Sequence, residues 1–150
     1  MSVIIIRSVY NWFASWITAF RKWNSDTTVA TEASNLIALW KQQARDFLGE
    51  TEHVPGAKFI IFDLWATHRN YRDAIATELG MTLEDKMAHN VSNAGGGSTW
   101  DSCLFDGRAH EMRVLRRWEK LADDKEYVQY MRDPELEELM QRIFGYGCPL

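Results

Sequence analysis

Two features of the sequence carry residues that could bind an anion together. The apolar run Val3–Ile6 predicts a β-strand, Arg7 follows it, and a helix-periodic segment that contains Ser15 begins almost at once. Beyond the carboxyl ends of parallel strands, helix N-termini present free N–H groups to anionic ligands. A guanidinium at this point would offer a phosphate a fixed fork of donors. The alternative is a buried strand that ends in a surface arginine paired with a carboxylate.

The second feature is the glycine run Gly95-Gly96-Gly97, which Ser98 follows. Glycine tolerates the backbone angles at which successive N–H groups converge on an anion. Together with Arg7, this segment could flank one phosphate, with charge on one side and main-chain donors on the other. An ordinary surface loop explains the glycines equally well.

These segments resemble sulfotransferases that use 3′-phosphoadenosine 5′-phosphosulfate (PAPS). In that family a strand ends in an arginine and a serine follows eight positions later, and both contact the 3′-phosphate; IIIRSVYNWFAS has this spacing. VSNAGGGSTWD resembles the family's glycine-rich loop, which closes over the same phosphate. The residues that the resemblance implies for binding PAPS, as a co-substrate, are Arg7, Ser15, Gly95, Gly96, Gly97 and Ser98.

The resemblance covers nearly the whole chain but corresponds to the later half of a typical sulfotransferase. The family's P-loop-like segment, which cradles the 5′-phosphosulfate, precedes the region resembled here, and so does the segment that supplies the usual base. The resemblance therefore implies one partial sulfotransferase-like domain over residues 1–150 that retains the 3′-phosphate half-site. It leaves open whether the chain transfers a sulfuryl group to an acceptor hydroxyl. The alternative function is a non-catalytic interaction or oligomerisation protein derived from the same fold.

No residue is assigned as catalytic. His68, His89 and His110 could each serve as a base, but nothing in their spacing indicates it, and surface or capping roles are commoner for such residues. Asp63, near the end of a second apolar run, could hold Arg7 in place or could be an ordinary carboxylate at a strand end.

Composition narrows the class of protein. The 150 residues suit one domain, and 46% hydrophobic and 25% charged residues are ordinary for a soluble globular chain. The net charge of −4 argues against a nucleic-acid binder, which would carry a basic stripe. Cys103 and Cys148 match no metal or redox spacing and the histidines form no ligand pair, so we expect free thiols, a cytoplasmic location and no metal.

The apolar stretch over residues 3–20 is the one segment that could suggest a membrane anchor. Arg7, Asn11, Ser15 and Thr18 interrupt it, and no cleavage site is visible. We therefore interpret it as a strand and a buried helix and expect a soluble chain. A membrane-surface protein that uses residues 3–23 is the weaker alternative.

Periodicity predicts the elements that must position these residues. The expected strands are residues 3–6 and 58–64. Two helices are expected near the N-terminus, 9–23 and 31–49, the second with Thr31 as its N-cap, and a third is expected to be capped by Thr67 or Asn70 and to end at Leu79. Further helices are expected over 83–89, 109–119 and 127–131, and a last one begins at Asp133-Pro134 and ends at Gly145. Residues 90–108 are expected to form a long loop.

Strand, helices and strand in this order predict a βαβ-type unit with parallel strands. With the resemblance, this gives an α/β fold of the P-loop type, a truncated three-layer arrangement with a small parallel sheet and mostly helical content. The absent strand would leave a sheet edge and the Trp-rich first helix uncovered. We therefore expect a homo-oligomer or a companion chain to cover them.

Overall fold

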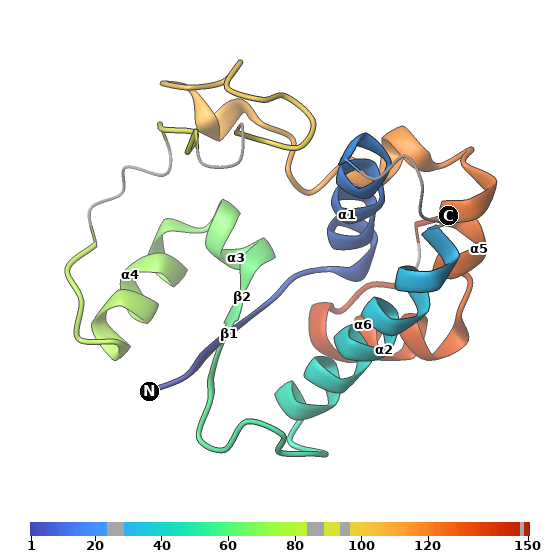
Figure 1. Ribbon diagram of the computed structural model, residues 1–150. Coiled ribbons are helices and arrows are strands. Elements are labelled where there is room, and N and C mark those ends of the chain that lie inside the picture. The colour runs from blue at the N-terminus through green and yellow to red at the C-terminus, as the bar shows by residue number, and fades with distance from the viewer. Residues whose placement is uncertain (24–28, 84–88, 94–96, 148) are drawn as a thin grey trace.

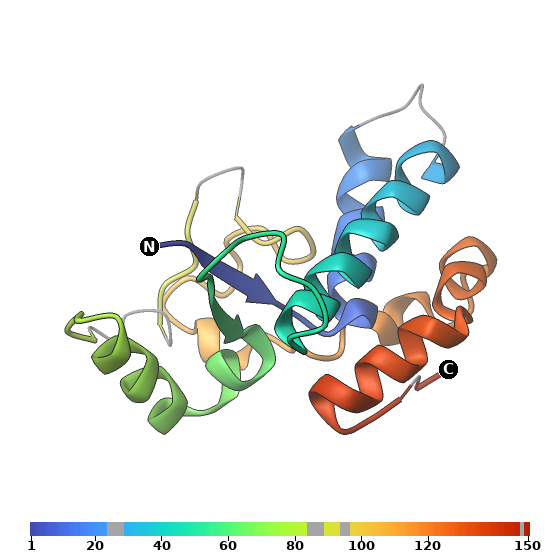
Figure 2. The same ribbon diagram turned by 90° about the horizontal axis from the view of Figure 1, so that it is seen from below.

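The structure is a computed structural model that describes residues 1–23, 29–83, 89–93, 97–147 and 149–150. It is a mixed α/β protein, mostly helical, with one two-stranded sheet in the described residues. The helices are α1 (Val9–Trp23), α2 (Val29–Phe47), α3 (Phe62–Thr67), α4 (Arg69–Glu78), α5 (Lys125–Met131) and α6 (Pro134–Phe144), and 3₁₀ turns lie at Ala109–Glu111 and Arg117–Leu121. Figures 1 and 2 show α1, α2, α5 and α6 grouped on one side of the sheet and α3 and α4 on the other.

The sheet pairs β1 (Val3–Ile6) with β2 (Lys58–Ile61) in parallel, as predicted. The prediction that β2 continues to Leu64 was wrong, because the chain turns into α3 at Phe62. A short apolar run cannot be assigned to a strand or to a buried helix by periodicity alone. The turn after Ile61 brings Asp63, in the first turn of α3, to the carboxyl end of the sheet.

Helix α1 supplies much of the core, and its predicted bounds of 9–23 are confirmed. Phe13 is fully buried, and its ring stacks on Trp16 (centroids 5.3 Å apart) and on Tyr127 of α5 (6.1 Å). Partly buried Trp12 also packs against this core. The chain itself thus covers most of the aromatic face of α1, while Trp23 at its end is 61% exposed.

The sheet has a more open side. On β1, Val3 and Ile5 are exposed, Ile5 to 60%, whereas Ile6 is buried. A partner that covers this side of β1 stays a prediction. Among the described helices, no segment has both the length and the apolar character that a bilayer crossing requires.

Several helix boundaries differ from those predicted. Helix α2 begins at Val29, so the prediction that Thr31 is its N-cap was wrong. The third predicted helix corresponds to α4, which follows an extended His68 and begins without a side-chain cap from Thr67 or Asn70. Helix α3, which precedes it, was not predicted. Most of the predicted helix over 83–89 lies outside the described residues, which omit 84–88.

The helix predicted over 109–119 was also wrong, and long-range hydrogen bonds explain why. An α-helix there would need the carbonyl of Val114 and the N–H of Arg117 for its own bonds. Instead, the Val114 carbonyl accepts from Arg7 (2.6 Å) and the Arg117 N–H donates to Asn11 (2.8 Å). Two 3₁₀ turns, Ala109–Glu111 and Arg117–Leu121, replace the helix.

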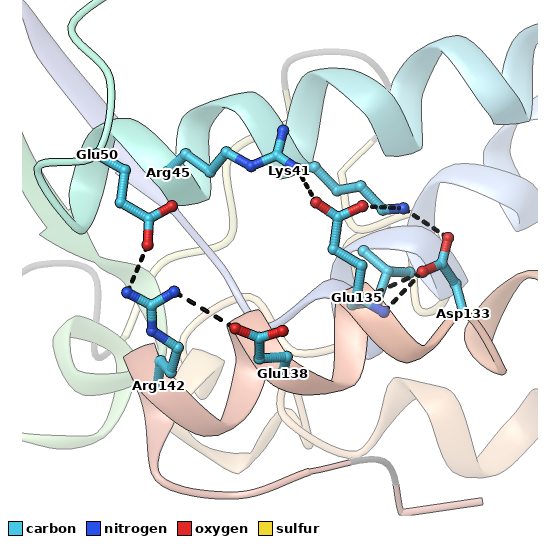
Figure 3. Close-up of polar contacts among 8 residues, drawn as sticks. Lys41, Arg45, Glu50, Asp133, Glu135, Glu138 and Arg142 are labelled. Atoms are coloured by element: carbon cyan, nitrogen blue, oxygen red, sulfur yellow. Dashed lines mark hydrogen bonds and ion pairs between the residues drawn. The ribbon is translucent and has the colours of Figure 1, made fainter.

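Helix α6 is confirmed with its predicted signals at both ends. The Asp133 side chain accepts from the N–H groups of Glu135 and Leu136, Pro134 stands in the first turn, and Gly145 ends the helix at φ +78°. Ion pairs tie α6 to α2 and to the turn after it (Figure 3). These pairs are Lys41 with Asp133 and Glu135, Arg45 with Glu135, and Arg142 with Glu50.

Replacing Asp133 with alanine should lower the free energy of unfolding by about 1–2 kcal/mol at pH 7, because it removes an N-cap and an ion pair. Burial acts to raise the pKa of Asp133, but hydrogen bonds from Lys41 and from the N–H of Glu135 outweigh it and hold the pKa below its ordinary value. This stabilisation is present above the unfolded pKa of about 3.9 and disappears as the pH falls through the folded pKa.

Urea unfolding between pH 7 and pH 3 measures this contribution. The difference between wild type and Asp133→Ala should shrink toward acid pH. Glu138→Ala is the matched control on the same helix, because Glu138 is exposed and lies 3.6 Å from Arg142. Its effect should stay within about 0.5 kcal/mol at every pH.

Candidate anion site at the strand ends

Arg7 follows β1 directly, and the fold holds its side chain in a fixed, partly buried position. Its Nη2 donates to the carbonyl of Val114 (2.6 Å), and its guanidinium lies 4.8 Å from the ring centroid of Phe62. Burial lowers the pKa of Arg7 to about 10, the charge of Asp63 opposes this, and the charge of Arg117 adds to it. Arg7 therefore remains charged at neutral pH, in surroundings that disfavour its charge.

One donor of Arg7 lacks an acceptor. The Nε atom is buried, and none of the residues that the structure describes accepts a hydrogen bond from it. A buried N–H without a partner costs about 1–3 kcal/mol, so an acceptor oxygen placed there would be favoured. An exposed arginine at the surface, the alternative reading of the sequence, would not be held in this way.

Asp63 ties the strand ends together. Its Oδ2 accepts from the N–H of Ser8 at the start of α1 (3.0 Å), and its Oδ1 accepts from the hydroxyl of Tyr146 (3.2 Å). Burial, and then the charge of Asp63, raise the pKa of Tyr146. Asp63 thus caps α1 from another segment of the chain, and it acts on Arg7 through its charge.

Ser15 belongs to a polar stripe on α1. Its hydroxyl donates to the carbonyl of Asn11 (3.0 Å), and Nδ2 of Asn11 donates to the hydroxyl of Ser8 (3.0 Å). Spacings of three and four residues place these side chains on one face of the helix. Buried Asn11 also accepts from the N–H of Arg117, so the stripe is anchored to the segment that replaces the predicted helix.

The glycine-rich loop is described from Gly97 onward; Gly95 and Gly96 lie outside the described residues. Gly97 has φ +88°, and a Cβ there would come within 2.6 Å of the carbonyl of Ser102. Ser98 and Ser102 exchange two backbone hydrogen bonds of 2.9 and 2.8 Å. Only glycine fits at position 97 without a shift of this turn, so Gly97 has a structural role that holds with or without a ligand.

Arg117 connects this turn to α1. Its side chain is buried and pairs with Oδ2 of Asp101 (2.6 Å), and its Nη2 lies 3.4 Å from the hydroxyl of Ser98. The guanidinium is also 5.9 Å from the ring centroid of Trp100, whose buried Nε1 has no partner among the described residues. The turn therefore contributes a second buried N–H donor that has no acceptor among the described residues.

Hydrogen bonds and charges thus connect predicted site residues that are far apart in sequence. Ser15 and Arg117 both form hydrogen bonds with Asn11, and Ser98 contacts Arg117 directly. The charge of Arg117 also contributes to the lowered pKa of Arg7. Figure 1 shows the chain after residue 97 on the side of the sheet where β1 and β2 end. Asn11 and Arg117 were not predicted as site residues. The available signal was an asparagine, Asn11, within a helix that is otherwise largely apolar.

A cavity of about 430 Å³ lies next to Arg7. Its lining residues are Phe62, Trp65, Ala66, Thr67, Arg72, Ala109, His110, Met112 and Val114. Two of them, Phe62 and Val114, are the residues that the Arg7 guanidinium contacts. The cavity thus has mainly aromatic and apolar walls, Arg72 is the cation in its lining, and Arg7 contacts two of its lining residues. Such a cavity suits a flat ligand that carries a negative group.

The described residues give less support to metal binding or to catalysis by cysteine or histidine. In the part of the chain that the structure describes, no group of three or more His, Cys, Asp or Glu side chains could hold a metal ion. Cys103 is a free, exposed thiol, and Cys148 lies outside the described residues. His110 lines the cavity and lies 5.9 Å from His89, ring to ring.

Comparison with protein-family models, with curated proteins and with solved structures found no match to this chain. What the site can bind therefore rests on its own residues and geometry.

Proposed function

We propose that this protein is a sulfotransferase-like protein that binds PAPS, or its desulfated product 3′-phosphoadenosine 5′-phosphate, at the carboxyl ends of β1 and β2. The observation that carries the proposal is the partly buried Arg7 guanidinium, whose Nε donor has no acceptor in the part of the chain that the structure describes. The 3′-phosphate would accept from Arg7, with Ser15, Gly95, Gly96, Gly97 and Ser98 as the further residues of the half-site. The proposal includes the P-loop type of α/β architecture.

The electrostatics of Arg7 favour a phosphate over a neutral ligand. Burial, and to a smaller degree the nearby Arg117, disfavour the charged form of Arg7; the charge of Asp63 opposes them, and the net result is a lowered pKa. A bound anion reverses this effect, because an opposite charge within a few ångströms stabilises the cation. Arginine also matches the geometry of phosphate oxygens better than lysine does.

The neighbouring cavity supports a nucleotide over free phosphate. Its volume of about 430 Å³ lies within the range of small-molecule sites. Phe62 and Trp65 give it aromatic walls, against which a purine ring can pack while its ribose phosphate reaches Arg7. The reaction proposed for a complete site is sulfuryl transfer from PAPS to an acceptor hydroxyl, and no residue of this chain is assigned to that step.

A thermal-shift titration with 3′-phosphoadenosine 5′-phosphate tests the proposal. At 100 times its Kd a ligand stabilises the folded state by about 2.7 kcal/mol, and a gain of this size raises the Tm of a chain of this length by roughly 5–10 °C. We expect such a rise for the wild type and none for Arg7→Gln. Because a Kd near 1 mM corresponds to only about 4 kcal/mol, the titration should extend to about 10 mM, where a site this weak would still give roughly half of this rise.

Two controls sharpen this test. Arg69→Gln removes an exposed arginine on α4 and should keep the full shift. Adenosine 5′-phosphate, which lacks the 3′-phosphate, should give a much smaller shift with the wild type. The absence of any shift for the wild type at the highest concentration would refute the proposed function.

A further inference from the structure

We infer that Arg117 is a positioning residue of the anion site, which holds the Ser98–Ser102 turn against the first turns of α1. The inference rests on the proposed function, since it concerns the same site. It assigns to Arg117 and its partner Asp101 a role that neither the spacing of Arg7 and Ser15 nor the glycine run indicates.

The backbone and side chain of Arg117 bind different parts of the site. Its N–H donates to Oδ1 of Asn11 (2.8 Å), which fixes the main chain at residue 117 on the polar stripe of α1. Its guanidinium pairs with Asp101 (2.6 Å) and reaches the hydroxyl of Ser98 (3.4 Å). Arg117 thus bridges the helix that carries Ser15 and the turn that carries Ser98.

Burial makes this bridge rigid. Arg117 is only 5% exposed, and the side chain of Asp101 is only 15% exposed. Loss of one partner would leave the other charge buried and uncompensated, a strongly unfavourable state. The Ser98 hydroxyl also accepts from the N–H of Trp100 (3.3 Å), so the whole turn from Ser98 to Asp101 is fixed relative to Arg117.

The position of Arg117 also matters to the charge of the site. Arg7 and Arg117 repel each other, and this repulsion contributes to the lowered pKa of Arg7. An anion between or beside two guanidinium groups relieves such repulsion. Arg117 therefore affects anion binding both by placing the turn and by adding to the positive potential at Arg7.

A residue that only stabilises the fold would make the same contacts as Arg117. The test therefore needs a measurement that depends on the ligand. The variants are Arg117→Met, Arg117→Lys and the double variant Asp101→Asn/Arg117→Met, which removes both buried charges and so remains folded if the single variant does not. Arg116→Met is the matched control, because Arg116 is the adjacent arginine but is exposed and pairs with Glu119. Calorimetry measures the Kd of 3′-phosphoadenosine 5′-phosphate and of adenosine 5′-phosphate for each folded variant.

We expect the Kd of 3′-phosphoadenosine 5′-phosphate to rise about tenfold or more in the Arg117→Met and double variants, the scale on which outer partners of ligand-binding groups act. Arg117→Lys should restore part of the affinity, and Arg116→Met should match the wild type. The Kd of adenosine 5′-phosphate should change little. In parallel, hydrogen exchange of the Ser98 and Ser102 amides should accelerate in Arg117→Met alone among the arginine-to-methionine single variants.

The outcomes separate the two proposals. Unchanged affinity for the 3′-phosphorylated nucleotide in a folded Arg117→Met or double variant would overturn the positioning role and leave the proposed function standing. Equal losses for both nucleotides would also overturn it, since a general loss of structure would then explain them. A wild-type chain that binds neither nucleotide would refute the proposed function and the positioning role with it, whatever the exchange rates show.

Discussion

Replacing Asp63 with alanine is expected to lower the free energy of unfolding by about 3 kcal/mol, within the range for breaking a buried charged interaction. Asp63 is only 7% exposed, and its carboxylate accepts from the N–H of Ser8 and the hydroxyl of Tyr146. Alanine would leave the Ser8 N–H buried without an acceptor and would remove the negative charge that offsets the burial of Arg7. Urea unfolding at pH 7, followed by circular dichroism, measures the change.

Asp63→Asn separates the two parts of this effect. An asparagine oxygen can still accept from Ser8, so the variant should lose less stability than Asp63→Ala. A loss below about 0.5 kcal/mol for the alanine variant, the size expected of a surface substitution, would show that Asp63 does not hold the strand ends.

Replacing Phe13 with alanine is expected to cost about 3–5 kcal/mol of the free energy of unfolding. The Phe13 ring is fully buried and contacts the rings of Trp16, Tyr127 and Tyr130, so its removal leaves a cavity where α1 meets α5. A loss of this size is comparable to the whole stability of many small domains. The measurement is urea unfolding at low temperature, where the variant keeps most of its structure.

Trp23→Ala provides the control for Phe13→Ala. It removes a larger aromatic side chain from the same helix, but this side chain is 61% exposed. Its cost should stay below about 1 kcal/mol, because little apolar surface leaves water there on folding. Similar costs for the two variants would contradict the core described for α1.

Local signals in the sequence were sufficient to predict where helices α1 and α6 lie. The aromatic stripe of α1 is regular over four turns, and α6 carries a capping aspartate, a proline in its first turn and a terminal glycine. In both helices the apolar face predicted from the sequence is the face that packs into the core, so tertiary contacts reinforce the local preference. The parallel pairing of β1 and β2 followed from the order of the elements.

The clearest wrong prediction of secondary structure occurs where hydrogen bonds to distant residues replace the local ones of a helix. Residues 109–119 have helical periodicity, but Arg7 and Asn11 take a carbonyl and an N–H that a helix there would need. Near Phe62, an apolar run suited to a strand turns into α3 instead. Periodicity reports which residues are apolar and contains no information about partners a hundred residues away.

Some residues of the candidate site could likewise be predicted from the sequence and others could not. The position of Arg7 after a strand, and of Ser15 on the following helix, could be read from local order and spacing. Asn11, Asp101 and Arg117 could not, because their importance arises from contacts with one another or with other distant segments. Residue types alone also could not show that Nε of Arg7 would be buried without an acceptor.

The residues that hold Arg7 and the start of α1 in place lie far along the chain, which affects when the site can form during synthesis. The contact from Arg7 to Val114 spans 107 positions of sequence, and the carboxylate that caps α1 is held in turn by Tyr146. During synthesis, Arg7 therefore emerges from the ribosome 107 residues before Val114, the residue whose carbonyl accepts its hydrogen bond. We therefore expect the anion site to take its final form only after Val114 and Tyr146 have both emerged.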